Sequence, residues 1–435
     1  MQKKIKETKG ITLVALIITV IILLILAGVT ISLVIGKNGL IAKSKESVDK
    51  YKDKAKEEQW QLEDFEAGME ELKDEEENPE LKQMKLVLNI TEDNKEIQLP
   101  VYTYSDDYKY DCTVNWGDGI IEQVTNENAK TKKHTYENTG EYTVVIEGTY
   151  ESLYYNSSIQ TALKKIEQWG VTGVKNIYLE DCANLEEIAE PSKNSFVNVA
   201  DFDRTFSGCS GLTSIPENLF ANCPNVTNFW LTFCRCSNLT NMPERLFANC
   251  SNVTSFDWTF EKCSGLTNIP ERLFANCLNV IRFNGVFSEC RSLISVPEKL
   301  FYNCQDVTNF NSIFLKCTNL VSVPEKLFAN CSNVTSFEHT FEECSSLRSI
   351  PERLYANCTN VTSFYRTFAY CTELRGKSIH LWEEGRSGID KNSGGEACYY
   401  MCEKLEDYSQ IPSYWAKEPR SNVKSHNESG LLIKI

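Results

Sequence analysis

Apolar residues recur at every third position through residues 206–367, where a 27-residue unit is written six times without an insertion. Both halves of each unit share this spacing; in the first copy they carry Phe206, Cys209, Leu212 and Ile215, then Phe220, Cys223, Val226 and Phe229. An apolar step of three suits neither a long strand, whose period is two, nor an amphipathic helix. The pattern predicts a stacked array of short extended pieces and tight turns, because no single repeat can bury its own apolar residues.

Polar positions in the array repeat with the same period. We expect one column of asparagine amides to hydrogen-bond the backbone of adjacent repeats; the column is Asn222, Asn249, Asn276, Asn303, Asn330 and Asn357. A column of glutamates lies beside a column of basic residues, which must offset repulsion between stacked carboxylates; examples are Glu244, Glu271 and Glu298 beside Arg245, Arg272 and Lys299. As exposed ion pairs these add little stability.

The ends of the array depart from the repeat. Residues 158–178 are expected to form a short helix and an entry cap, and a degenerate first repeat follows at Cys182. After Leu374 the 27-residue frame breaks, and it partly returns at Tyr399 and Cys402. Terminal repeats are usually atypical because they cap the array.

Residues 84–150, which precede the array, show the alternation of strands. Runs rich in β-branched and aromatic residues are separated there by turn residues. Asp118-Gly119 lies between two such runs, and glycine accepts the positive φ of a tight turn at little cost. A small β domain is therefore expected.

The N-terminal part has a helical pattern. Residues 11–35 carry no charge, and these 25 residues suffice to cross a bilayer as a tilted helix. From Val48 to Leu72 apolar residues lie three and four apart, which predicts a helical stalk over 36–78, with a coiled coil between chains as the alternative. More lysines follow the span than precede it, which favours a cytoplasmic C-terminal side, but large domains translocate regardless of charge.

Charge and cysteine content narrow the function. The net charge of −15, without a basic stripe, argues against nucleic acid as a partner. Of the 18 cysteines, most form two columns in the array that begin at Cys209 and Cys223, whereas zinc ligands usually come in closely spaced pairs. We favour buried thiols that pack as small hydrophobes. Disulfides between neighbouring repeats and metal binding are the alternatives.

The positions that differ between repeats are where specificity can lie. The most variable pair precedes each repeated phenylalanine, and stacking would align these pairs along one edge. The candidate partner-binding residues on this edge mix aromatic and charged character; they are Trp230, Trp258, His339, Tyr365 and Arg366. Trp, Tyr and Arg are the usual anchors of protein interfaces. The alternative is that unconstrained surface positions vary without a function.

No residues form a recognisable catalytic pattern. The four histidines belong to no nucleophile or metal arrangement, and neither a phosphate loop nor a nucleophile elbow occurs. Asp118 and His134 favour turn and strand roles over catalysis. Glutamates that recur in every repeat favour a structural role over paired-carboxylate chemistry. We therefore expect no enzyme activity, cofactor or metal.

Three resemblances add to these patterns. The junction between Gly10 and Ile11, followed by the apolar run, resembles the N-terminus of type IV prepilins and pseudopilins. This likeness implies cleavage after Gly10 by a prepilin peptidase and methylation of Ile11. The sequence departs from that family at Ala15, where the family usually has glutamate, and at Ile11, where phenylalanine is commonest.

The second resemblance lies in the β domain. VNWGDG at 114–119, HTY at 134–136 and GEYTV at 140–144 resemble the PKD-type immunoglobulin-like sandwich. This likeness implies a spacer domain.

The third covers residues 158–415, whose F-x2-C-x2-L-x2-I core and NVTSF runs resemble BspA-like leucine-rich-repeat surface proteins of bacteria. It implies a leucine-rich-repeat solenoid that mediates adhesion at the cell surface.

The sequence thus predicts a multi-domain chain. Its expected parts are a basic leader (1–10), a transmembrane helix (11–35), a helical stalk (36–78), a PKD-like β-sandwich (84–150), a leucine-rich-repeat solenoid (158–415) and a C-terminal tail (416–435). We expect a cell-membrane protein with a single N-terminal span and extracellular domains, which binds an extracellular protein or cell-surface ligand. The alternative is a minor pilin-like subunit that displays the repeats on a filament or secretion apparatus.

Overall fold

The computed structural model describes residues 55, 58–59, 62, 79–102, 106–382 and 394–417. The chain divides into two units, residues 1–73 and 74–435. In the first unit the described residues are helical and exposed; they are Ala55, Glu58, Gln59 and Leu62. The predicted span over 11–35 and most of the predicted stalk lie outside the described residues.

The expectation of a transmembrane and stalk helix is corrected by the structure. Within the described residues, no helix is both long and apolar enough to cross a membrane. The α-helices in the described residues from Pro79 onward are short: α3 is Ser157–Ala162 and α4 is Ser413–Ala416. Most apolar residues there lie at strand or three-residue spacing and are buried in sheet and repeat cores, which leaves no continuous apolar helix. The N-terminal helical part of the expected fold class and the single-span membrane localisation are therefore wrong for the described chain.

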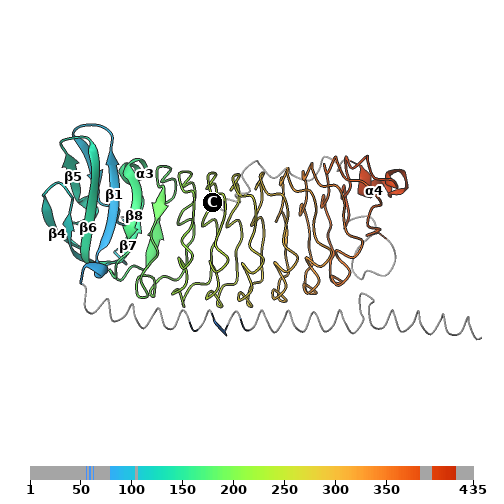
Figure 1. Ribbon diagram of the computed structural model, residues 1–435, viewed down its shortest axis with the longest axis horizontal. Coiled ribbons are helices and arrows are strands. Elements are labelled where there is room, and N and C mark those ends of the chain that lie inside the picture. Colours follow the sequence, from blue (N-terminus) through green and yellow to red (C-terminus); the bar gives the residue numbers. More distant parts are fainter. Residues whose placement is uncertain are drawn as a thin grey trace, which may run out of the picture. The chain divides into compact units, whose positions relative to one another are not determined.

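A six-stranded sheet forms the β domain, with strand order β10-β8-β1-β6-β3-β4 (Figure 1). Its strands are β1 (Met84–Ile90), β3 (Tyr110–Asn115), β4 (Ile121–Thr125), β6 (Gly140–Tyr150), β8 (Leu163–Gln168) and β10 (Glu187–Ile188). A separate pair joins β2 (Lys95–Gln98) to antiparallel β5 (Lys133–Tyr136). Strand β3 alternates as predicted, because Tyr110, Cys112 and Val114 are buried while Asp111 and Thr113 are exposed. The likeness to a PKD-type sandwich stays a prediction.

The β3–β4 turn depends on glycine. Gly117 has φ +87°, and a Cβ there would lie 2.6 Å from the carbonyl oxygen of Thr143. The turn closes with a hydrogen bond from Trp116 N–H to Ile120 O at 3.0 Å. Both the left-handed backbone and the close approach require a residue without a side chain.

The segment between domain and array contains a strand that the sequence pattern did not indicate. Helix α3 is capped by Asn156, whose side chain accepts from Ile159 N–H at 3.1 Å. The chain then extends as β8, which pairs antiparallel with β1 and parallel with β10. Strands β7 (Ser152–Tyr154) and β9 (Asn176–Tyr178) also pair in parallel. One continuous hydrophobic core runs from Met84 to Trp415, so the β domain closes the first end of the array.

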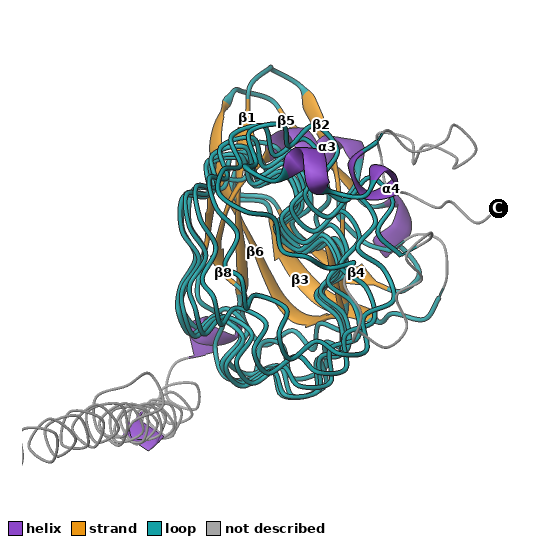
Figure 2. Ribbon diagram, turned by 90° about the vertical axis from the view of Figure 1, so that its right-hand side faces the viewer, coloured by secondary structure: helices purple, strands orange, loops and turns teal. Residues whose placement is uncertain are grey.

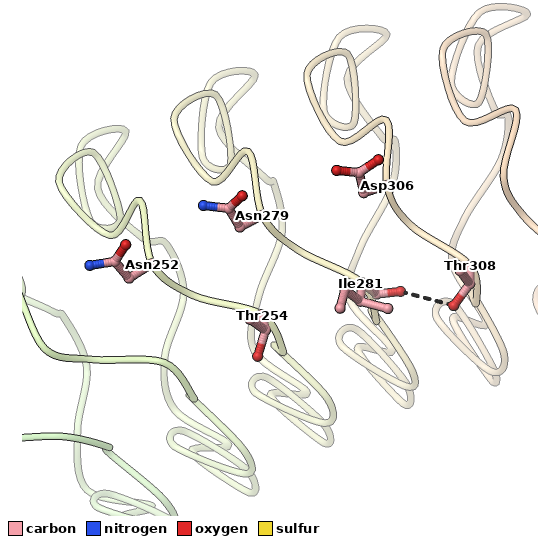
Figure 3. A pocket seen from close by; sticks show the side chains of 6 residues that line it. All are labelled: Asn252, Thr254, Asn279, Ile281, Asp306 and Thr308. Carbon is pink, nitrogen blue, oxygen red and sulfur yellow. Dashed lines mark hydrogen bonds between the residues drawn. The ribbon is translucent and has the colours of Figure 1, made fainter.

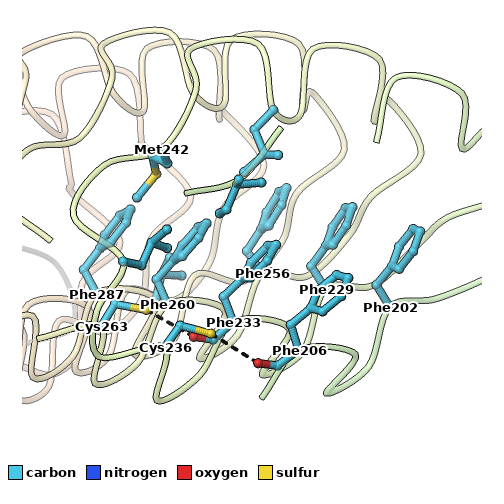
Figure 4. Close-up of a cluster of buried hydrophobic side chains, with 14 of the residues drawn as sticks. Phe202, Phe206, Phe229, Phe233, Cys236, Met242, Phe256, Phe260, Cys263 and Phe287 are labelled. Atoms are coloured by element: carbon cyan, nitrogen blue, oxygen red, sulfur yellow. Dashed lines mark hydrogen bonds between the residues drawn. The ribbon is translucent and has the colours of Figure 1, made fainter. Parts of the chain in front are cut away.

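The array consists of turns and short extended pieces, as predicted, and its repeats overlie one another in the end-on view (Figure 2). Equivalent residues in consecutive repeats form parallel bridges, such as Asn228 with Ser255 and Ser295 with Ser322. Phenylalanines stack along the core (Figure 4), where the rings of Phe229 and Phe256 have centroids 5.4 Å apart and lie 2° from parallel. Burial therefore comes from the neighbouring repeat, as a stacked array requires.

The predicted asparagine ladder is confirmed from Asn249 to Asn357. The Nδ2 of Asn249 donates to Ala221 O at 3.0 Å, and that of Asn276 donates to Ala248 O at 2.8 Å, each in the preceding repeat. The same contact recurs at Asn303, Asn330 and Asn357. It satisfies backbone carbonyls that the irregular turns leave without a partner.

The cysteines are buried and free, all 18 of them. The cysteines of the column that begins at Cys209 donate a hydrogen bond from Sγ to a backbone carbonyl of the preceding repeat. Cys263, for example, donates to Phe233 O at 3.1 Å. Burial raises the pKa of the Cys304 thiol to about 12 and that of Cys263 well above its ordinary value. These thiols therefore pack as small core residues rather than as nucleophiles.

The far end of the array is closed by α4. Tyr399 stacks on Phe368 with centroids 5.5 Å apart and so continues the aromatic column. Trp415 of α4 is fully buried, and a Cβ at Gly395 would lie 2.2 Å from its indole. Glycine at that position lets the tryptophan seal the last repeat.

Candidate functional site

The variable pairs of the array lie at one turn of each repeat, which we call the variable corner. It comprises Trp230-Leu231, Asp257-Trp258, Asn284-Gly285, Asn311-Ser312, Glu338-His339 and Tyr365-Arg366. Backbone hydrogen bonds join consecutive pairs, as from Leu231 N–H to Asp257 O at 3.1 Å and from Trp258 N–H to Asn284 O at 2.7 Å. The five candidate residues lie along this corner and are all half-buried; they are Trp230, Trp258, His339, Tyr365 and Arg366.

The backbone of the corner is the same in every repeat. The second residue of each pair is left-handed, with φ of +55° at Leu231, +60° at Trp258 and +57° at His339. Residues with side chains adopt this conformation rarely and at a cost. Variation at these positions therefore does not mean that the fold leaves them free. The turn fixes their backbone and leaves only the side chain to vary.

Two tryptophans mark the N-terminal end of the corner. The guanidinium of Arg204 lies 4.7 Å from the ring centroid of Trp230, within the range of a cation–π contact. Trp258 lies directly on the next repeat, because a Cβ added at Gly285 would come within 2.1 Å of its indole Cε3. Each ring is thus held on one side and partly exposed.

A charged network marks the C-terminal end. Glu342 is 5% exposed and binds both His339 Nδ1 and Arg366, whose Nε donates to Oε1 at 2.6 Å. Burial raises the pKa of Glu342, but His339 and Arg366 outweigh it, so the pKa is lowered overall. Arg366 lies 5.4 Å from the ring centroid of Tyr370, and His339 meets Tyr365 edge-on at 5.0 Å. These contacts order the side chains before any partner arrives.

Small side chains occupy the middle of the corner. The two central pairs are Asn284-Gly285 and Asn311-Ser312. Asn311 is turned toward the next repeat, since its Oδ1 accepts from Glu338 N–H at 3.0 Å and from the Ser336 hydroxyl at 2.6 Å. The corner therefore carries bulky aromatic and charged groups at both ends and small groups between them.

A family comparison identifies the repeats. Residues 172–308 and 264–372 match the model of the BspA type leucine rich repeat region, in six copies. The repeats are BspA-type leucine-rich repeats. The match confirms the resemblance found in the sequence for this part of the chain, and such repeats suggest a protein that interacts with other proteins or acts at a surface.

Comparisons with curated proteins and with solved structures give no further relative that bears on function. No curated protein matches the chain. One similar solved structure is described as the Toll - Spatzle complex, a molecular hub in Drosophila development and innate immunity, with 13% identity and a TM-score of 0.13. The match covers 42% of this chain and 36% of that one, so this chain spans about a third of the other's length. A TM-score that low carries no argument about fold or function.

The BspA-type array has a second variable pair that the sequence argument overlooked. It follows each repeated phenylalanine, as Cys234-Arg235, Glu261-Lys262, Ser288-Glu289, Leu315-Lys316, Glu342-Glu343 and Ala369-Tyr370. Ion pairs join several of these residues between repeats, such as Arg235 with Asp181 at 3.1 Å and Lys262 with Glu289 at 3.8 Å. The same comparison of aligned repeats would have found this pair, because it also differs in every copy.

The other candidate positions lie elsewhere. Gly10 and Ile11, the predicted cleavage site, are outside the described residues. In the β domain, His134 Nε2 lies 2.7 Å from Asp118 Oδ2, and the imidazole stacks on Trp116 with centroids 4.8 Å apart. This is the turn and strand packing favoured by the sequence. Among the described residues, no group of three or more His, Cys, Asp or Glu could hold a metal ion.

Proposed function

We propose that this chain binds a protein partner through the variable corner of its BspA-type array and so acts as an adhesion protein. One observation carries the proposal: the corner keeps one backbone in every repeat while its side chains change. A fold that only needed to close the turn would not require a tryptophan, a histidine or an arginine in a left-handed conformation.

The side chains at the corner fit a protein surface. Trp230 packs against Arg204 and Trp258 against Gly285, and both residues stay partly exposed. Arg366 is fixed by Glu342. Pre-ordered aromatic and arginine side chains lose little entropy on binding and commonly dominate interface energetics. We propose binding without a catalytic step, and with no cofactor.

The test is a double substitution, Trp230→Ala with Trp258→Ala, in the full chain. Surface plasmon resonance would compare it with the unaltered chain on purified fibronectin, laminin and collagen. We expect a partner bound by the unaltered chain to lose at least about tenfold in affinity, since truncated anchors commonly cost more than 1.4 kcal/mol. Circular dichroism should show that the array stays folded.

Tyr302→Ala is the matched control, because Tyr302 is an aromatic residue that is 39% exposed but lies outside the corner. It should leave binding unchanged. Equal loss in the control and the double variant, or no loss in either, would show that the corner varies without a binding role.

A further inference from the structure

A second asparagine ladder runs along the array, and it is broken at one repeat. The Nδ2 of Asn252 donates to Pro224 O and that of Asn279 to Ser251 O, both at 2.9 Å. The same contact to the carbonyl 28 residues earlier is made by Asn225, Asn333 and Asn360. The equivalent position in the remaining repeat is Asp306, whose carboxylate has no hydrogen to donate.

The break puts an acceptor where the ladder has a donor. In Figure 3 the amide nitrogens of Asn252 and Asn279 point toward the preceding repeat, and an oxygen of Asp306 takes the same place. The carbonyl that this position would serve is that of Leu278. Among the described residues, neither the Asp306 carboxylate nor the Leu278 carbonyl has a hydrogen-bond donor. Asp306 is exposed, and its carboxylate can accept charge-assisted hydrogen bonds from a positively charged donor.

Two exposed apolar side chains lie in the repeat that precedes Asp306. Leu278 is 55% exposed and Ile281 is 46% exposed. The adjacent repeats carry polar residues in these two columns; they are Ser251 and Gln305 beside Leu278, and Thr254 and Thr308 beside Ile281. Ile281 and Asp306 line one open groove, with a volume of 540 Å³, together with Asn252, Thr254, Asn279 and Thr308 (Figure 3). Ile281 thus gives this groove an apolar side chain beside the Asp306 carboxylate, on an otherwise polar face.

We propose that this groove binds a lysine or arginine side chain of a partner protein. The proposal rests on the proposed function in that it takes the partner to be a protein, but it uses columns outside the variable corner. The cationic head donates to the Asp306 carboxylate and to the Leu278 carbonyl, and the aliphatic stem lies on Leu278 and Ile281. The net charge of −15 draws basic segments toward the chain.

The test uses fluorescence polarisation with labelled nine-residue peptides of valine and serine whose central residue is arginine, lysine or norleucine. The full chain should bind the arginine and lysine peptides at least about tenfold more tightly than the norleucine peptide. Added salt should reduce this preference, because the charge pair is exposed. Asp306→Asn should abolish the preference while keeping the fold, since asparagine restores the ladder.

Two further variants separate the parts of the site. Glu217→Gln is the matched control, because it removes an exposed carboxylate outside the groove and should change nothing. Ile281→Thr restores the threonine column and keeps the charge, so it should weaken all three peptides together and leave their ratio unchanged. A preference that persists in Asp306→Asn, or its absence in the unaltered chain, overturns the proposal.

The preference for the cationic peptides should not depend on the variable corner. Trp230→Ala with Trp258→Ala should leave the peptide preference intact, whatever it does to binding of matrix proteins.

Discussion

In the β domain the polar contacts belong to single residues, whereas in the array the asparagine and cysteine contacts recur every 27 residues. The hydroxyl of Tyr136 donates to Trp116 O, and that of Tyr150 donates to Pro100 O, both at 2.8 Å, and neither contact has a counterpart. In the array the amides of Asn276 and Asn303 make the same bond one repeat apart, at 2.8 and 2.7 Å. The two regions nevertheless share one core.

This difference governs how each region responds to damage. A contact that occurs once in the β domain has no substitute. Its loss should destabilise the whole sheet, because the strands of that sheet pair across long sequence distances. A contact in the array is one of a series, and each repeat touches mainly its neighbours. Damage in the array should therefore be local and additive, whereas damage in the β domain should be specific to the residue.

Phe274→Ala should have the largest effect. The ring is fully buried, with centroids 4.8 Å from those of Phe256 and Phe283. Removing a buried phenylalanine from a core costs about 3–5 kcal/mol of unfolding free energy. Urea unfolding would measure the loss, and hydrogen exchange should show it confined to the repeats around residue 274, with β1 still protected.

Leu278→Ala, an exposed apolar truncation in the same repeat, is the control and should stay within about 0.5 kcal/mol. Loss of protection in β1 along with the repeats would show that the shared core makes the two regions a single cooperative unit. It would contradict the expectation that damage in the array stays local.

The sequence predicted the array well because its period states which residues face inward. Columns such as Cys263 and Asn276 lie where the 27-residue repeat placed them. The pattern could not give the sign of φ at the corner, because Leu231, Trp258 and His339 share no residue type that signals a left-handed backbone. That conformation follows from closing the turn against the next repeat.

Tertiary pairing explains the second difference between prediction and structure, which is strand β8. The sequence predicts a short helix and an entry cap over residues 158–178, but not that residues 163–168 form strand β8, which pairs with the edge of β1. The candidate corner could be predicted in part, since variation between repeats is visible in a single sequence. The groove at Asp306 could not, because an asparagine-to-aspartate change has meaning only once its hydrogen-bond partner is known.

Paired ladder substitutions should have an intermediate effect and test additivity directly. Asn276→Ala and Asn303→Ala each remove one bond to a backbone carbonyl, at about 1 kcal/mol apiece. The double variant should lose about 2 kcal/mol if the repeats respond independently. Asn238→Ala is the control, because that exposed asparagine belongs to neither ladder. Urea unfolding of the five chains gives the comparison, and a double loss far from the sum would show that the two bonds do not act independently.

Asp118→Asn should have the smallest effect and probes a contact that occurs once. Burial opposes ionisation of Asp118, but hydrogen bonds from Ile120 N–H and His134 lower its pKa overall. A depressed pKa means that the carboxylate stabilises the fold above its unfolded value of about 3.9, and that this stability is lost as the pH falls through the folded value. Asparagine keeps an acceptor for Ile120, so the cost at pH 7 should be about 1 kcal/mol.

The distinguishing result is the dependence on pH. Between pH 6 and pH 2 the unaltered chain should lose more stability in the β3–β4 turn than Asp118→Asn does, as measured by hydrogen exchange of that hairpin. Glu127→Gln, an exposed carboxylate in the same domain, should leave the acid dependence as it is. Equal acid sensitivity in all three chains would mean that the β domain, like the array, spreads its electrostatic stability over many small contacts.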